Sequence, residues 1–312
     1  MNRQILALVT AFSVAVSLTA CSGEGRVNVD RSTTQSLPLI VATSGIVADF
    51  TARIAGDAAR VESLIPNGYD SHTYEPKPSE MTLLADADLI VTADETLNAT
   101  VTGLVQLSGD VDRILDLNAS ALDESDFILR EPGNRASANP HTWTSPVLAA
   151  RWVGSLTDRI VALAPEQEAS IRTNAGLLVA DLEQLDRDLR AALADLGTDR
   201  RKMVVYHDAW VYFGREYGLE IVGALQAVSF AEPSAAELAR MADQIRAEGV
   251  RVFFGSEVFP SDVLEALEAE SGARYVPDLA DDRLPGQPGD PDHNYLALMR
   301  ANLEVLVNGL TA

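Results

Sequence analysis

Three of the four histidines occupy places where a fold could expose them to a common ligand. His72 lies in a polar loop after an apolar run that ends at a proline, and His207 directly follows a second apolar run. His141 lies in a turn bracketed by Pro140 and Pro146. A neutral imidazole is a ligand for Zn, Cu, Ni and Fe, and histidines this far apart match no zinc motif within a single helix. We therefore expect the three histidines to meet on one metal ion.

Two adjacent carboxylates could complete such a site. Asp281 and Asp282 follow the last predicted strand, and residue type alone does not separate them from each other or from a solvated turn. Three imidazoles with one carboxylate suit tetrahedral Zn²⁺, whereas a carboxylate-rich set favours Mn²⁺ or Mg²⁺. The fourth histidine, His293, lies beside the final predicted helix. We expect it to face solvent, with a transient metal contact as the alternative.

Strands that alternate with helices predict the α/β fold that must position these side chains. The spacing indicates βαβ units and two lobes, each with a mostly parallel four-stranded sheet flanked by helices. Loops at the carboxyl ends of parallel strands are where ligands bind in such folds, so the metal site is expected in the crevice between the lobes. The predicted strands are 39–42, 60–65, 88–92 and 112–117 in the first half, and 203–206, 220–225, 250–254 and 274–277 in the second.

A long helix is predicted between the two series of strands. From Glu166 to about Leu196, leucines and an isoleucine recur at helical spacing with charged residues between them. At ~1.5 Å per residue this helix would be roughly 45 Å long, which suits a rigid connector. The predicted parts of the chain are a signal peptide at 1–20, a lipidated tether at 21–36, an N-terminal α/β lobe at 37–164, the connecting helix at 165–196 and a C-terminal α/β lobe at 197–312.

The N-terminus has the features of an export signal. Arg3 precedes an apolar run at 5–16, which is too short to cross a bilayer permanently. The segment then ends in Leu-Thr-Ala-Cys, which resembles a bacterial lipobox and makes Cys21 the expected site of lipidation; an ordinary secretory signal is the alternative. Cys21 is the only cysteine, which excludes internal disulfides and thiolate metal sites. We expect an extracytoplasmic protein, in the periplasm or at the cell surface, held at the membrane only through its lipid anchor.

The composition is that of a soluble globular protein with an acidic surface. Hydrophobic residues make up 47% of the chain, and the formal net charge is −22. Nucleic-acid binding needs a basic surface, so we expect no nucleic-acid partner. An acidic surface attracts cations at long range. The alternative is that the acidic residues only keep the surface solvated. Two Asn-x-Ser/Thr triplets, which begin at Asn98 and Asn118, look like glycosylation sites and are interpreted as chance matches in a bacterial chain.

Several segments resemble the lipid-anchored metal-ion solute-binding proteins of bacterial ABC importers, the cluster 9 group for zinc, manganese and iron. The resemblance covers essentially the whole mature chain and implies two α/β lobes bridged by a long helix, with metal bound in the crevice. The segments that carry it are Asp-Ser-His-Thr-Tyr-Glu-Pro-Lys-Pro-Ser at 70–79, Asn-Pro-His-Thr-Trp at 139–143, His207 with Tyr-Gly-Leu at 217–219, Glu-Pro-Ser at 232–234 and Asp-Arg-Leu at 282–284.

The resemblance also implies four ligands. His72 and His141 match the first two family ligands, and His207 matches the third, where manganese and iron members typically have glutamate. Asp282 is the best match to the fourth, although an arginine follows it in place of the usual serine, and Asp281 stays open. This set implies a protein that captures Zn²⁺ and delivers it to an ABC transporter permease.

Other hypotheses use the same residues. A manganese- or iron-binding member of the same family would hold Mn²⁺ or iron in place of Zn²⁺. A zinc-dependent hydrolase of the cell envelope would need an open coordination position. A surface adhesin is a third possibility, because relatives have been assigned to a cell adhesion family. The leading hypothesis is a monomeric binding protein rather than an enzyme, with the permease, and as a further candidate a periplasmic or surface metallochaperone, as partners.

Overall fold

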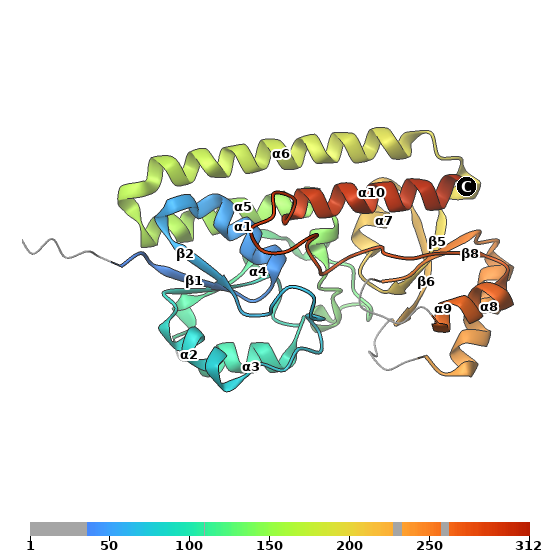
Figure 1. Ribbon diagram of the computed structural model, residues 1–312, viewed down its shortest axis with the longest axis horizontal. Helices are drawn as coiled ribbons and strands as arrows, with labels where there is room; N and C mark the ends of the chain where they lie inside the picture. Colours follow the sequence, from blue (N-terminus) through green and yellow to red (C-terminus); the bar gives the residue numbers. More distant parts are fainter. Residues whose placement is uncertain (1–35, 109, 227–232, 257–261) are drawn as a thin grey trace, which may run out of the picture. The chain divides into compact units, whose positions relative to one another are not determined.

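The computed structural model of this protein describes residues 36–108, 110–226, 233–256 and 262–312. The predicted signal peptide at 1–20 and the lipidation site Cys21 lie outside the described residues, as does the predicted tether apart from Ser36. Residues 37–312 form one compact unit that contains two separate β-sheets (Figure 1).

The first half of the chain forms a four-stranded parallel sheet, as predicted. In spatial order its strands are β2 (Arg60–Ser63), β1 (Leu39–Ala42), β3 (Leu89–Thr92) and β4 (Ile114–Asp116). Strands β1 and β3 are buried along their whole length. Strands covered on both faces are apolar throughout. This explains why the sequence shows runs of apolar residues here rather than an alternation of apolar and polar residues.

Helices cover both faces of this sheet (Figure 1). They are α1 (Gly45–Ala55), α2 (Pro78–Asp86), α3 (Ala99–Leu107), α4 (Leu117–Ala121) and α5 (Pro146–Leu163). One apolar cluster, which includes Phe50 and Trp152, packs α1 and α5 against one face of the sheet. A second cluster, which includes Leu84 and Val105, packs α2 and α3 against the opposite face.

The starts of these helices follow from local sequence. Ser44, Asn98 and Ser145 precede α1, α3 and α5, and each side chain accepts a hydrogen bond from a backbone N–H of the first turn. Such caps satisfy N–H groups that have no partner within the helix. Pro146 occupies the first turn of α5, where its lack of an N–H does not matter. The start of α5 therefore follows from Ser145 and Pro146.

The second half repeats the same plan. Its four parallel strands are, in spatial order, β6 (Glu220–Gln226), β5 (Lys202–His207), β7 (Val252–Phe254) and β8 (Arg274–Val276). Strand β5 is longer than predicted, so His207 is its last residue rather than the first residue after it. The helices of this half are α7 (Val211–Tyr217), α8 (Ala235–Glu248), α9 (Asp262–Ser271) and α10 (Tyr295–Thr311).

One long helix, α6 (Glu168–Ala194), packs against α1 and α5 of the first half and against α10 of the second (Figure 1). Its 27 residues correspond to a length of ~40 Å, which confirms the predicted long helix. A single apolar cluster also includes residues of both sheets, so the halves share a core and are not joined by α6 alone. The exact domain boundaries stay a prediction. The buried side chains of α6 recur at helical spacing and are Ile171, Ala175, Leu178, Leu182, Leu185, Leu189 and Leu193.

The packing of α10 against β7 requires a glycine. A Cβ atom at Gly309 would lie 2.5 Å from Cζ of Phe254, a fully buried ring, whereas a Cβ at Gly176 in α6 would meet nothing within 4 Å. Gly309→Ala should lower the free energy of unfolding by about 1–3 kcal/mol through overpacking. Gly176→Ala should raise it by about 0.5–1 kcal/mol, because alanine loses less backbone entropy. Urea unfolding measures both changes, and equal effects of the same sign would contradict the packing argument.

Within the described ranges, the helices lack the combination of length and apolar character needed to cross a membrane.

Candidate metal centre

The fold brings the imidazoles of His72, His141 and His207 together. Nε2 of His141 lies 2.8 Å from Nε2 of His72 and 2.9 Å from Nε2 of His207. His72 comes from the loop after β2, His141 from the turn before α5, and His207 from the end of β5. Among the residues that the structure describes, these three histidines form the group whose potential metal-binding atoms all lie within 4.8 Å of one another. The arrangement can hold a single metal ion.

Two of the rings are oriented by oxygen acceptors. Nδ1 of His72 donates to the carbonyl of Leu97 at 3.0 Å, and Nδ1 of His141 donates to Oδ1 of Asn139 at 2.8 Å. In the neutral form of each ring, a proton on Nδ1 leaves the lone pair of Nε2 directed at the centre of the group. Metal-binding histidines are oriented by acceptors of this kind.

Burial keeps two of the imidazoles neutral. His141 has no solvent exposure, and its burial is the main reason why its pKa lies well below the usual value; His207 and His72 lower it further. Burial also lowers the pKa of His207, to about 3, with a further contribution from His72. Neutral imidazoles are the form that binds a metal ion, so protons compete weakly at these two positions near neutral pH.

The two candidate carboxylates contact different residues of the site. Asp281 is buried, and its Oδ2 lies 3.6 Å from Nε2 of His207. Oδ2 of the partly buried Asp282 accepts hydrogen bonds from the backbone N–H and the hydroxyl of Ser71, which precedes His72. Burial raises the pKa of Asp282, and the nearby His72 lowers it. Asp281 therefore lies beside Nε2 of His207, and Asp282 is hydrogen-bonded to the loop that carries His72.

A buried asparagine links His141 to the second half of the chain. Oδ1 of Asn139 accepts from both the backbone N–H and Nδ1 of His141. Its Nδ2 donates to the backbone carbonyl and to Oδ2 of Asp208, the residue after His207, and Arg130 pairs with the same carboxylate at 3.1 Å. Sequence reasoning assigned no role to Asn139 or Asp208, although their places next to predicted ligands were a usable signal.

His293 lies apart from the three-histidine group. It is half-buried rather than fully exposed, and its Nδ1 lies 2.8 Å from the carbonyl of Pro285. With Asp49 and Leu284 it lines a cavity of about 580 Å³ beside α1. The expectation that His293 simply faces solvent is therefore only partly correct.

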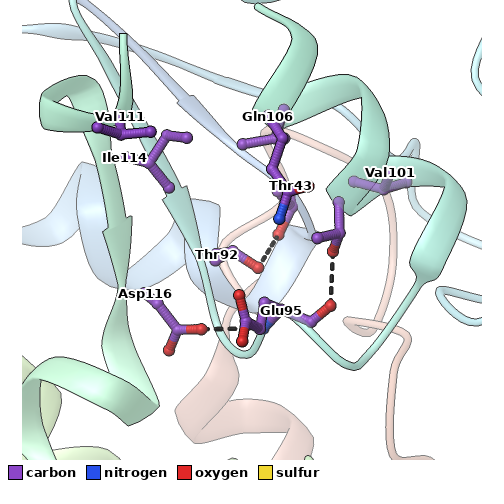
Figure 2. Close-up of a pocket in the computed structure, with 10 residues that line it drawn as sticks. Thr43, Thr92, Glu95, Val101, Gln106, Val111, Ile114 and Asp116 are labelled. Carbon is purple, nitrogen blue, oxygen red and sulfur yellow. Dashed lines mark hydrogen bonds between the residues drawn. The ribbon is translucent and has the colours of Figure 1, made fainter. Parts of the chain in front are cut away.

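A further cavity, of about 260 Å³, lies beside α3 at the carboxyl ends of β3 and β4 (Figure 2). Its lining combines aliphatic side chains with Glu95 and Asp116 and includes none of the three clustered histidines. Oδ2 of Asp116 accepts from the backbone N–H of Glu95, and Oδ1 accepts from that of Ala119. Burial, the largest cause, raises the pKa of Asp116 to about 6, with smaller contributions from Asp94 and Glu95.

The raised pKa of Asp116 predicts a pH-dependent contribution to stability. The folded pKa, about 6, exceeds the ordinary value of 3.8, so this contribution is complete below pH 3.8 and is lost as the pH rises through 6. Relative to Asp116→Asn, the wild-type free energy of unfolding should increase by about 2 kcal/mol between pH 7.5 and pH 4, since each pKa unit corresponds to about 1.4 kcal/mol. Urea unfolding of both proteins across this range measures the difference, and a difference that stays constant would contradict the prediction.

The fold and the site define a class of protein: a two-lobed α/β binding protein with clustered histidines. The fold is similar to that of the periplasmic zinc binding protein TroA from Treponema pallidum, with a TM-score of 0.80 and 23% identity over 88% of this chain and 99% of that chain. The chain belongs to the family described as "Zinc-uptake complex component A periplasmic", whose family model matches residues 40–309.

Relatives in this family are named for different metals. The high-affinity zinc uptake system protein ZnuA of Bacillus subtilis is 28% identical over 279 residues, 87% of each chain. The manganese-binding lipoprotein MntA of Halalkalibacterium halodurans is 25% identical over 275 residues, 87% of this chain and 88% of that protein. The family membership that the sequence motifs implied is therefore confirmed.

Proposed function

We propose that this chain captures Zn²⁺ outside the cytoplasm, through His72, His141, His207 and one carboxylate, and delivers it to an ABC transporter permease. The observation that carries the proposal is the pair of imidazole nitrogens, of His72 and His141, that face each other at 2.8 Å. Both rings have their Nδ1 protons engaged by oxygen acceptors. Two lone pairs at this separation repel each other, and a cation between them removes that repulsion.

The type of ligand favours zinc. Zinc–nitrogen bonds of about 2.0–2.1 Å in a tetrahedral site place two nitrogen ligands ~3.3 Å apart. Zinc binding therefore needs only a small separation of the rings of His72 and His141. Nitrogen-rich sites favour zinc, whereas oxygen ligands favour manganese. Mn²⁺ stays the alternative ion because a relative of this chain is named as manganese-binding.

The contacts favour Asp281 as the fourth ligand, with Asp282 in a supporting position. Oδ2 of Asp281 lies beside Nε2 of His207, whereas Oδ2 of Asp282 is engaged by two donors of Ser71. The sequence match to the family favours Asp282 instead. Isosteric substitution of each residue separates the two assignments.

Metal titration of the purified protein tests the proposal. Protein stripped with a chelator should bind one Zn²⁺ per chain, and Zn²⁺ should bind at least about 100-fold more tightly than Mn²⁺, in keeping with the intrinsic order of affinities. Competition against a chromogenic chelator measures the first affinity, and displacement of Mn²⁺ by Zn²⁺ measures the second. Absence of zinc binding, or tighter binding of Mn²⁺, would overturn the proposal.

A binding role is also favoured over an enzymatic one. Catalytic zinc sites keep a coordination position for water, and a fourth protein ligand would fill that position here. Ester hydrolysis by the zinc-loaded protein, lost in His207→Ala, would instead support a hydrolase.

The location and partners belong to the same proposal. A lipid on Cys21 would hold the protein at the outer face of the cytoplasmic membrane, and a relative of similar length is named as a lipoprotein. Cys21→Ser should then move the protein from the membrane fraction to the soluble fraction.

We expect a monomer that docks on the permease, with a metallochaperone as a further candidate partner. Growth of a deletion strain in zinc-depleted medium should be restored by the wild type and not by His207→Ala.

A further inference from the structure

A fully buried asparagine, Asn118, uses every hydrogen-bonding position of its side chain. Its Nδ2 donates to Oδ2 of Asp94 at 3.1 Å and to the carbonyl of Pro140 at 3.2 Å. Its Oδ1 accepts from Oγ1 of Thr142 and from Nε1 of Trp152. A side-chain amide has two donor hydrogens and two acceptor lone pairs, so the capacity of Asn118 is full.

Two of these bonds hold the turn that carries His141. Pro140 and Thr142 are the residues on either side of His141, and Asn118 bonds to both. The turn is thus held immediately before and after His141, whose Nε2 lies within 2.9 Å of Nε2 of each of the other two histidines. A shift of this turn would move Nε2 of His141.

Asn118 is also connected to the loop of His72, through the segment of residues 94–98. The backbone N–H of Asn118 donates to the carbonyl of Ala93, and its side chain holds Asp94. In the same segment, the carbonyl of Leu97 orients the ring of His72.

The last residue of this segment, Asn98, is hydrogen-bonded directly to the His72 loop. Nδ2 of Asn98 donates to the carbonyls of Ser71 and Tyr74, which lie on either side of His72, at 2.7 and 3.1 Å. Asp116 also holds the segment, through the backbone N–H of Glu95 (Figure 2). Hydrogen bonds and short backbone segments therefore connect the two imidazoles on the side away from the metal centre.

We propose that Asn118 is a positioning residue that fixes the separation of the His72 and His141 imidazoles and thereby sets the affinity for the metal ion. The inference rests on the proposed function, because the affinity it controls is that of the three-histidine group. Removing this fully bonded amide takes four hydrogen bonds away from its partners in a low-dielectric interior, and the two loops lose their common anchor. The burial of Asn98 and Asn118 also shows that both glycosylation-like triplets have a structural role in this fold.

The test compares Asn118→Ala with a variant that loses stability far from the metal centre. Leu178→Ala removes apolar contacts and leaves a cavity in the buried face of α6, which packs against α1, α5 and α10. Zinc affinity is measured by chelator competition on metal-free protein, and stability by urea unfolding. Asn118→Ala should weaken Zn²⁺ binding about 10–100-fold, the usual effect of removing a group that orients a metal ligand, whereas Leu178→Ala should leave the affinity of the folded protein unchanged.

A second pair of variants, each of which removes a single hydroxyl, tests the proposal if Asn118→Ala does not fold. Thr142→Val removes one hydrogen bond to Asn118, and Thr157→Val removes a similar buried hydroxyl bond within α5, to the carbonyl of Val153. Thr142→Val should weaken zinc binding several-fold, and Thr157→Val should not. The visible absorption spectrum of the Co²⁺-loaded proteins, which reports the coordination geometry, should change in Thr142→Val and stay as in wild type in Thr157→Val.

The outcomes separate this inference from the function on which it rests. If wild-type protein does not bind zinc, the proposed function is wrong. If wild type binds zinc, but Asn118→Ala and Thr142→Val match their controls in affinity and in the Co²⁺ spectrum, only the positioning role of Asn118 is wrong.

Discussion

Replacing His141 with alanine should weaken zinc binding by on the order of 1,000-fold. Nε2 of His141 lies within 2.9 Å of the corresponding atom of both other histidines, so its removal takes away one ligand and opens the centre of the group. Zinc sites of four ligands bind with about 10–16 kcal/mol, so one ligand accounts for about 2.5–4 kcal/mol, and the upper value corresponds to about 1,000-fold. Chelator competition on the metal-free variant measures the loss.

His293→Ala is the matched control for this substitution. It removes the remaining histidine of the chain, whose ring nitrogen lies against the carbonyl of Pro285 and not in the three-histidine group. Zinc affinity should stay within about threefold of wild type. An unchanged affinity in His141→Ala, or an equal loss in both variants, would show that the three-histidine group does not hold the ion.

Asp281→Asn should weaken zinc binding by on the order of 100-fold, and Asp282→Asn by about tenfold or less. Asparagine keeps the size of aspartate and removes the negative charge. At Asp281 the charge lies beside Nε2 of His207, where it can compensate the charge of a bound dication. At Asp282 the remaining amide oxygen can still accept a hydrogen bond from Ser71.

The order of these two effects identifies the fourth ligand. A larger loss in Asp282→Asn would assign the ligand to Asp282, as the sequence match implied, and would leave Asp281 as a neighbour of Ser256 and His207. Losses of similar size in both variants would indicate that the two carboxylates share the ion. Unfolding measurements on both variants show whether either effect comes from lost stability.

The His72 loop and the loop that follows β8 are also joined by a contact that involves none of the proposed ligands. Nδ2 of Asn67 donates to the carbonyls of Leu284 and Gly286, at 3.2 and 3.4 Å. This contact joins the two loops independently of the proposed ligands. The carboxylate loop is therefore attached to the first half of the chain both here and through Ser71 and Asp282, and a metal ion would add a further connection.

The regular elements could be predicted because their signals are local. Apolar runs marked β1 and β3, and the residues Ser145 and Pro146 marked the start of α5. Element ends were less accurate: β5 includes His207, and α6 ends at Ala194 rather than near Leu196. The last residues of an element depend on neighbouring strands and helices, which a single sequence does not display.

The supporting residues of the metal centre could not be predicted in the same way. Asn118 was considered only as part of a chance match to a glycosylation site, and nothing in the sequence indicated that it is fully buried and bonded to four groups from three other segments. Asp281 and Asp282 are neighbours in the sequence, but one contacts His207 and the other Ser71. These contacts depend on the direction in which each side chain points in the folded chain. Residue type and spacing therefore do not predict them.

By itself, the sequence determined the parallel α/β plan, the long helix and the three histidines as the candidates for binding a metal ion. These follow from the periodicity of apolar residues and from the chemistry of imidazole, both of which are properties of short segments. Only the tertiary structure showed that three imidazoles from distant segments lie close together, that Asp281 contacts His207 while Asp282 contacts Ser71, and which buried asparagines hold the surrounding loops. Those features depend on the relative positions of segments that are far apart in the chain, to within a few tenths of an ångström. Packing and buried hydrogen bonds set these positions.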